Sequence, residues 1–154
     1  MYIFTHISKV IIFSKQSFGE LTPNEIRTDW DPFDLEMENG IRIEVKSSAY
    51  LQSWKQHDFS KISFDIAPKR TWDSKTNEYS SKSTMHSDYF VFCLLHHRDQ
   101  NSIDPINLDQ WTFYVLKTKV LNSEKGNQKR IGLNSLLKLG PIECKFGEIK
   151  SQII

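Results

Sequence analysis

Two acidic residues and a lysine lie close together in a segment whose pattern predicts a β-hairpin. Asp34 precedes the tripeptide Glu44-Val45-Lys46 by ten residues, with an Asn-Gly pair between them. Converging carboxylates repel each other, and a hard cation such as Mg²⁺ or Mn²⁺ relieves that repulsion. Such a cation activates a bound water and neutralises charge on a phosphodiester, while a lysine holds the phosphate or orients the water. The set predicts metal-assisted phosphodiester hydrolysis, with Asp34 and Glu44 as metal ligands and Asp34, Glu44 and Lys46 as catalytic residues.

The length of the turn decides whether the two carboxylates meet. Glu44 and Lys46 are two residues apart and share one face of a strand. A two-residue Asn-Gly loop turns Asp34 away from Glu44. A three-residue loop over 38–40 pairs Met37 with Ile41 and places Asp34 opposite Glu44. Such a loop is a type I turn followed by a left-handed residue, where glycine is favoured, so we predict this register.

The elements around the hairpin predict a mixed sheet. A serine N-cap and two apolar residues three apart predict a short helix over 47–56. Alternating apolar and polar residues predict a half-exposed strand over 61–66. We then expect, in order, a long polar loop, a strand buried on both faces, another strand and two short helices, at 67–87, 88–95, 111–116, 118–121 and 133–139. This order predicts an α/β or α+β fold with a mixed central β-sheet.

Composition limits the broad class of the protein. A chain of 154 residues suits a single domain over 1–154. The net charge of +1 excludes a polybasic nucleic-acid coat, so a nucleic-acid site must be a local patch. Two cysteines make no disulfide framework, and Cys93 lies in an apolar run typical of a reduced core thiol. No run approaches the roughly 18 apolar residues of a membrane span. We therefore expect a cytoplasmic protein without a membrane partner.

The step from Asp34 to Glu44-Val45-Lys46 resembles the core motif of the PD-(D/E)XK nucleases, which share the restriction-endonuclease-like fold. The stretches WDPFDLEMENGIRIEVKSSAYLQSW (30–54) and SDYFVFCLL (87–95) are similar to uncharacterised bacterial members, and the resemblance covers about 30–121. It implies a mixed sheet flanked by helices, and a Mg²⁺- or Mn²⁺-dependent DNA endonuclease serving in defence or DNA processing. It also implies Asp34, Glu44 and Lys46 as the site residues.

The resemblance extends to further residues and departs from the family pattern in two places. A glutamine or lysine on the helix after the lysine strand sometimes joins the family's site, which makes Gln52, Gln56 and Lys55 accessory candidates. The proline–aspartate pair of the motif is not literal here, so Asp31 competes with Asp34 as the acidic ligand. Many members also carry an acidic residue on a helix before the hairpin, whereas the first nineteen residues have none. The N-terminal 1–28 is therefore interpreted as diverged or shortened, and the number of metals stays open.

A weak electrostatic pattern favours DNA as the partner. Between residues 46 and 82 the sequence has seven Lys or Arg against four Asp or Glu. The loop over 67–87 could track a phosphate backbone, with Lys69 and Arg70 as nucleic-acid-binding residues together with Lys55. Family members often dimerise to cut both strands, which leaves a homodimer open. The alternatives are a degenerate nuclease-fold domain that binds DNA or a partner protein, and an RNA-processing nuclease.

Overall fold

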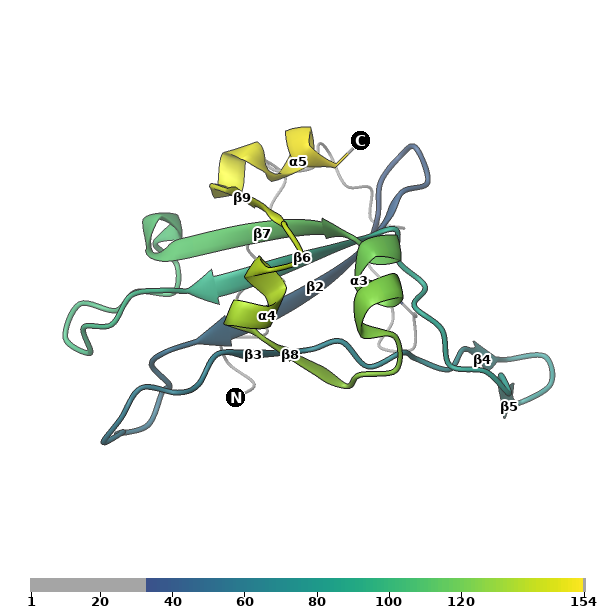
Figure 1. Ribbon diagram of the computed structural model, residues 1–154, viewed down its shortest axis with the longest axis horizontal. Helices are drawn as coiled ribbons and strands as arrows, with labels where there is room; N and C mark the ends of the chain where they lie inside the picture. Colours follow the sequence, from purple (N-terminus) through teal and green to yellow (C-terminus); the bar gives the residue numbers. More distant parts are fainter. Residues whose placement is uncertain (1–32, 154) are drawn as a thin grey trace.

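A five-stranded mixed sheet forms the centre of the structure, a computed structural model that describes residues 33–153. The strand order is β1-β2-β6-β7-β9, and only β2 and β6 run parallel (Figure 1). The strands are β1 (Leu35–Glu36), β2 (Arg42–Ala49), β6 (Tyr89–Leu95), β7 (Trp111–Lys117) and β9 (Ile142–Cys144). The mixed central sheet and the coarse α/β (α+β) class are thereby confirmed. The expectations for 1–28 and Asp31 lie outside the described residues.

Two smaller strand pairs and a few short helices surround this sheet. Antiparallel pairs join β3 (Ser63–Asp65) to β8 (Arg130–Gly132) and β4 (Trp72–Asp73) to β5 (Glu78–Tyr79). The helices are α3 (Thr118–Lys125), α4 (Leu133–Leu137) and α5 (Ile149–Gln152), with 3-10 turns η2 (Leu108–Gln110) and η3 (Phe146–Glu148). Within the described part of the chain, none of these helices has the length and apolar character that crossing a bilayer requires.

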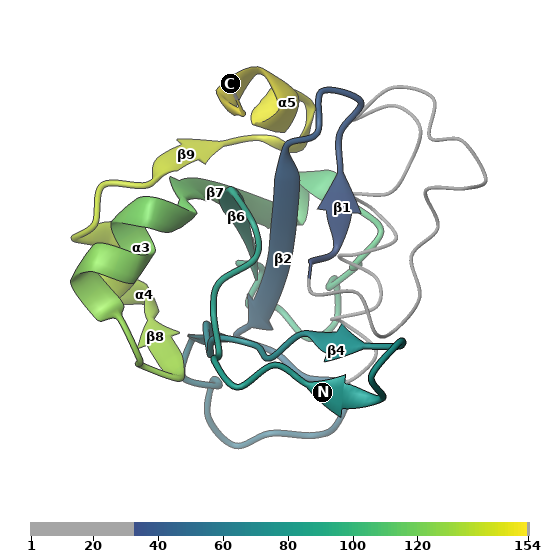
Figure 2. The same ribbon diagram turned by 90° about the vertical axis from the view of Figure 1, so that its right-hand side faces the viewer.

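The sheet is buried on both faces because its central strand is apolar throughout. Every residue of β6 is buried. Its Val91 side packs in a cluster with Ile149 of α5, and its Phe92 side packs with Leu121 of α3 and Leu136 of α4. Figure 2 shows α3, α4 and β8 together on one side of β6, away from α5. The predicted strand buried on both faces is confirmed.

The predicted helix over 47–56 is wrong. β2 continues to Ala49, and no helix follows before β3. Residues Ser47 and Ala49 stay in parallel register with Cys93 and Leu95 of β6. A helix of about ten residues is marginally stable on its own. Hydrogen bonding of this segment to the fully buried strand β6 therefore outweighs its local helix propensity.

Other predicted elements agree more closely with the structure. In the segment 61–66, Ile62, Phe64 and Ile66 are buried. Asp65 between them is exposed, as the alternation of apolar and polar residues predicts. The helices predicted from 118 and 133 are α3 and α4. The segment over 67–87 is not a plain loop, because it contains the β4–β5 pair. We call residues 69–86 the arm, and Figures 1 and 2 show it projecting from the body beside β2.

Candidate functional site

The β1–β2 hairpin has the three-residue register that the sequence predicts. Leu35 pairs with Ile43, and the amide of Met37 donates to the carbonyl oxygen of Ile41 at 2.8 Å. Gly40 has a φ of +81°, the left-handed conformation that this turn places on glycine. Continued by one residue, the register brings Asp34 to the level of Glu44. The hairpin therefore has the predicted register, in which Asp34 and Glu44 lie opposite each other.

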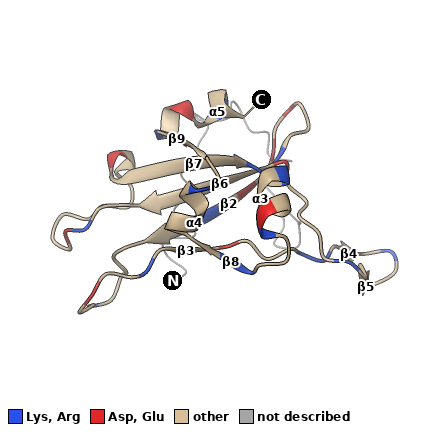
Figure 3. Ribbon diagram, viewed as in Figure 1, with Lys and Arg blue, Asp and Glu red and all other residues tan. Residues whose placement is uncertain are grey.

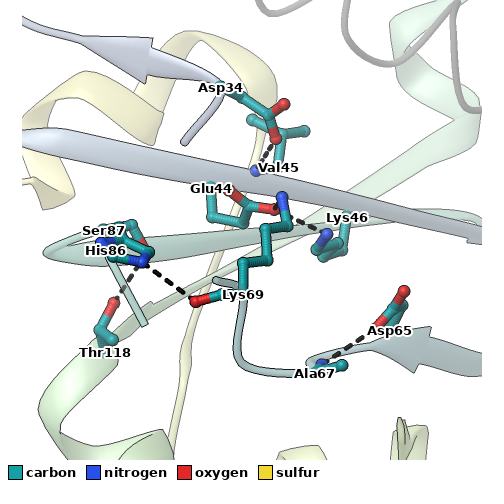
Figure 4. A network of polar contacts seen from close by, with 10 residues as sticks. All are labelled: Asp34, Glu44, Val45, Lys46, Asp65, Ala67, Lys69, His86, Ser87 and Thr118. Carbon is teal, nitrogen blue, oxygen red and sulfur yellow. Dashed lines mark hydrogen bonds and ion pairs between the residues drawn. The ribbon is translucent and has the colours of Figure 1, made fainter. Parts of the chain in front are cut away.

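Asp34 lies just before β1, and its side chain adds a hydrogen bond to β2 beyond the last pair of the β1–β2 hairpin. Its Oδ2 accepts a hydrogen bond from the amide of Val45 at 2.8 Å, while its own amide donates to the carbonyl oxygen of Ile43 at 3.0 Å. Figure 4 shows the carboxylate turned toward β2 at Val45, one residue from Glu44. The Asp34 carboxylate is thus held beside the part of β2 that contains Glu44 and Lys46.

Glu44 is the centre of the site. Glu44 is only 3% exposed, although its side chain carries a carboxylate. Oε1 lies 2.7 Å from the Nζ of Lys46 and 2.6 Å from the Nζ of Lys69 (Figure 4). Oε2 is buried and has no hydrogen-bond partner among residues 33–153. One oxygen therefore meets two ammonium groups, while the other is left unpaired.

A small pocket opens against this cluster. Its walls come from β2, from the two ends of the arm and from the start of β6, and its lining residues are Glu44, Lys46, Ala67, Lys69, Thr84, Met85, His86, Ser87 and Phe90. The two lysines and several neutral polar groups make this lining suited to an anion beside the Glu44 carboxylate. Glu44 and Lys46, two of the three predicted catalytic residues, border this pocket together with the arm, whereas Asp34 does not line it.

Lys69 belongs to this site although the sequence indicated only a backbone contact to nucleic acid. Its amide and carbonyl pair with Thr84 at 3.0 and 2.9 Å, which closes the base of the arm. The Nε2 of His86 lies 3.1 Å from the Lys69 carbonyl oxygen, to which a protonated Nε2 donates. The backbone is therefore fixed, and the side chain reaches Glu44. Lys69 is 25 residues from Glu44 in the chain, so no local spacing signals the contact.

The glutamine and lysine accessory candidates lie elsewhere. Gln52 and Gln56 follow the far end of β2 and bond each other, with Gln56 Oε1 accepting from the Gln52 amide at 2.7 Å. Both side-chain amides also donate to Ser60 Oγ, at 3.3 and 2.8 Å. Lys55 is exposed in the same loop. Ala49 is five residues beyond Glu44, or about 16 Å along a strand, so this loop is separate from the Glu44 pocket.

Arg70 points along the arm rather than into the pocket. Its Nε donates to the carbonyl oxygen of Ser80 at 2.6 Å, and its guanidinium lies 5.8 Å from the centre of the Tyr79 ring. Tyr79 in turn packs edge-on against Trp72, with ring centres 4.8 Å apart. Arg70 thus lies on the arm and outside the Glu44 pocket, and its predicted contact with a phosphate backbone stays a prediction.

The residues present fit a divalent cation in part. Among residues 33–153, no group of three or more His, Cys, Asp or Glu is arranged around a metal position. Glu44 Oε2 is nevertheless a buried anionic oxygen in need of a partner. A Mg²⁺ ion is commonly held by one or two carboxylates with waters and substrate phosphate completing its shell, which Glu44 and Asp34 could supply.

The thiol behind the site is chemically inert. Burial raises the pKa of Cys93 well above its ordinary value, and the Asp34 charge adds to this effect. Both Cys93 and Cys144 are free and buried, which confirms the reduced core thiol expected for Cys93. Because the thiolate is the nucleophile of cysteine chemistry, neither residue is suited to catalysis at neutral pH.

No protein-family model, curated protein or solved structure matches this chain. The geometry of the site combines a buried carboxylate, a second carboxylate one residue away along the strand, two ammonium groups and a pocket open to an anion. Such a set can bind a cation and a phosphate side by side.

Proposed function

We propose that this chain is a Mg²⁺- or Mn²⁺-dependent DNA endonuclease that hydrolyses phosphodiester bonds. The observation that supports it best is Glu44, a buried carboxylate with two ammonium groups on Oε1 and no partner on Oε2. A buried polar oxygen without a partner destabilises the fold, so its retention needs an explanation other than stability. A bound cation would supply that partner.

In this proposal each residue of the hairpin has a separate task. Glu44 and Asp34 would hold the ion, which supplies charge neutralisation at the phosphate and a water that ionises near neutral pH. Lys46, two residues beyond Glu44 on the same strand face, would hold the scissile phosphate and orient the attacking water. The Lys46 Nζ lies 2.7 Å from Glu44 Oε1, which holds the lysine beside the carboxylate. The arm would contact the neighbouring phosphates.

The restriction-endonuclease-like fold is part of the same proposal. Three features favour it: the antiparallel hairpin that carries the acidic residues, the lysine two residues after the second acid, and the parallel pairing of the hairpin's long strand with a buried strand. The connection from β2 to β6 contains β3 and the arm, where the resemblance implies a helix. The proposed member is therefore one with few helices.

Cleavage assays with purified full-length protein test the proposal. Supercoiled plasmid, linear duplex and single-stranded DNA would be incubated with Mg²⁺, Mn²⁺ or EDTA. We expect metal-dependent cutting by the wild type, and a loss of at least about a hundredfold in Glu44→Gln and Lys46→Met, a typical scale for removing one transition-state contact.

A matched pair of control variants separates chemistry from folding. Glu143→Gln and Lys145→Met remove one exposed acid and one exposed lysine from the opposite edge of the sheet. Both should cut like the wild type. Equal cutting by Glu44→Gln and the wild type would show that the nuclease activity comes from another site or from a contaminant.

The second candidate is a catalytically degenerate domain that binds DNA or a partner protein. Two observations favour it: the lysine pair already balances the acidic pair, and the described residues hold no three-ligand metal cluster. Thermal unfolding with Mn²⁺ and Mg²⁺ distinguishes the candidates. A metal-dependent rise in Tm that disappears in Glu44→Gln supports the enzyme. An unchanged Tm combined with salt-dependent binding of labelled DNA supports the binding domain.

A further inference from the structure

Among the side chains of residues 33–153, the charges around Glu44 balance without any metal ion. Asp34 and Glu44 contribute two negative charges, and Lys46 and Lys69 contribute two positive charges within one small region of β2 and the arm. A divalent cation added to this set would leave two uncompensated positive charges at a buried carboxylate. Repulsion between the cation and the ammonium groups would then weaken metal binding unless one lysine withdraws.

The two lysines differ in their freedom to withdraw. Lys46 is anchored in β2, and its side chain is 18% exposed. The Lys69 side chain is 44% exposed, and it reaches Glu44 from the base of the arm rather than from the same strand. Solvent is therefore available to the Lys69 ammonium once it leaves Glu44. The Lys46 ammonium has less access to solvent from its place on β2, so its withdrawal from Glu44 would be more costly.

We propose that Lys69 is a positioning residue that compensates the Glu44 charge in the metal-free protein and leaves Glu44 when a divalent cation binds. This inference rests on the proposed metal-dependent function. Lys69 then acts as an internal cation that pairs with the buried carboxylate and orients it before the metal arrives. After withdrawal, its ammonium stays in the pocket lining, beside the place where a phosphate would sit.

The arm gives this exchange a direct connection to substrate binding. The Lys69 backbone pairs with Thr84, and its carbonyl oxygen lies 3.1 Å from His86 Nε2, so its Cα is fixed to the closed base of the arm. Only the side chain is free to move between Glu44 and the pocket. Phosphates bound along the arm would attract the released ammonium and so favour metal entry.

Calorimetric titration of Mn²⁺ into the full-length protein tests the competition. Lys69→Met should bind Mn²⁺ at least about fivefold tighter than the wild type, the lower end of typical coupling between sites. Lys69→Arg keeps the charge and should bind close to the wild-type affinity. Lys75→Met, which removes an exposed lysine from the tip of the same arm, serves as the control and should leave the affinity unchanged.

A spectroscopic readout follows Lys69 itself. In protein labelled with ¹³C-lysine, the Lys69 ε-methylene signal can be identified by its loss in Lys69→Arg. It should shift toward the position of solvent-exposed lysines when Mg²⁺ is added, and it should shift the same way in Glu44→Gln without metal. A purely structural ion pair would respond to Glu44→Gln and not to Mg²⁺.

The outcomes separate the two proposals. If the wild type binds Mn²⁺ through Glu44 while Lys69→Met binds with equal or weaker affinity, the exchange is overturned and the metal site stands. A Lys69 signal that stays in place at saturating Mg²⁺ also overturns the exchange. If no variant binds metal but the signal still moves in Glu44→Gln, the ion pair is real and the metal-dependent function itself fails.

Discussion

The described residues satisfy only one oxygen of the buried Glu44 carboxylate. A buried carboxylate retained as a structural ion pair would be expected to satisfy both oxygens. Here Oε1 is shared by Lys46 and Lys69, whereas Oε2 has no partner among residues 33–153. An unsatisfied buried acceptor costs about 1–3 kcal/mol of folding free energy. The site thus holds a cost that a more apolar set of residues would avoid.

A triple substitution tests whether the site sacrifices stability. Replacing Glu44, Lys46 and Lys69 together by methionine removes the buried charges while it roughly keeps their volume. Swaps of this kind are often neutral or stabilising by about 1–4 kcal/mol. We expect a higher free energy of unfolding in urea for the triple variant than for the wild type. Lys69→Met alone should lower it, since Glu44 loses a partner, and a triple variant less stable than this single one would contradict the idea.

Local spacing is enough to find three of the four charged residues of the cluster. Asp34, Glu44 and Lys46 are joined by a tight hairpin, so their relative placement follows from strand alternation and turn length. The contact of Lys69 with Glu44 is not predicted, because it spans 25 residues of the chain and no local spacing indicates it. Gln52 was expected near the site only through the helix that the resemblance implied, and the structure has an extended strand and loop there instead.

At the scale of the elements, Gly40 fixes the hairpin that positions Asp34 against β2. Its φ of +81° is strained for any residue with a side chain, although a Cβ would meet no atom within 4 Å. Gly40→Ala should therefore lower the free energy of unfolding by about 1 kcal/mol through backbone strain alone. Gly147→Ala is the matched control, because it also has open space around it and no positive φ. Chemical denaturation of both variants measures the difference, and equal losses would exclude a role for the left-handed turn.

The arm should provide much of the affinity for a phosphate backbone. Residues 69–86 contain four Lys or Arg against two Asp or Glu, and Figure 3 marks the basic positions along it. Replacing Arg70, Lys75 and Lys82 by glutamine should weaken DNA binding and make the dependence of log K on log salt shallower, by about 0.9 per lost phosphate contact on duplex DNA. Fluorescence anisotropy at several salt concentrations measures this slope.

The control for the arm removes equal charge elsewhere. Lys138, Lys145 and Lys150 are exposed lysines in the C-terminal part of the described chain, near α4, β9 and α5. Their joint replacement by glutamine changes the net charge as much as the arm variant does. A similar loss of salt dependence in both triple variants would mean that overall charge, and not the arm, attracts the nucleic acid.

Some of the elements can be predicted from the sequence, and others cannot. The buried strand β6 and the alternating segment around Phe64 follow directly from apolar periodicity. The strands β8 and β9 have three residues each, too few for a period to show, and β8 forms only through its pairing with β3. Short segments of this kind take their conformation from neighbours that are distant in sequence, which composition does not indicate.

At the scale of the whole molecule, the β1–β2 hairpin determines where the candidate site lies. The site is not at the carboxyl ends of the parallel strands. In open α/β sheets, ligands usually bind outside the carboxyl ends of parallel strands. Glu44 is instead the third residue of β2, near its amino end, where β1 joins from one side and the arm from the other. Both faces of the sheet are filled by apolar clusters at this level. The buried site is therefore accessible mainly where hairpin and arm meet.

Alkaline pH should destabilise the whole fold through its buried acids. Burial raises the pKa of Cys144 from 9.0 to about 11, and it also raises the pKa of Cys93 and Tyr114. A raised pKa in the folded state means that the thiol ionises first in the unfolded chain. The stabilisation of the folded state by the protonated Cys144 thiol is therefore complete below about pH 9 and is lost as the pH rises toward 11. Urea denaturation under reducing conditions should show a free energy of unfolding that falls over this interval. Cys144→Ala should fall less steeply, whatever its stability at pH 7, and parallel curves for the two proteins would show that this thiol does not contribute.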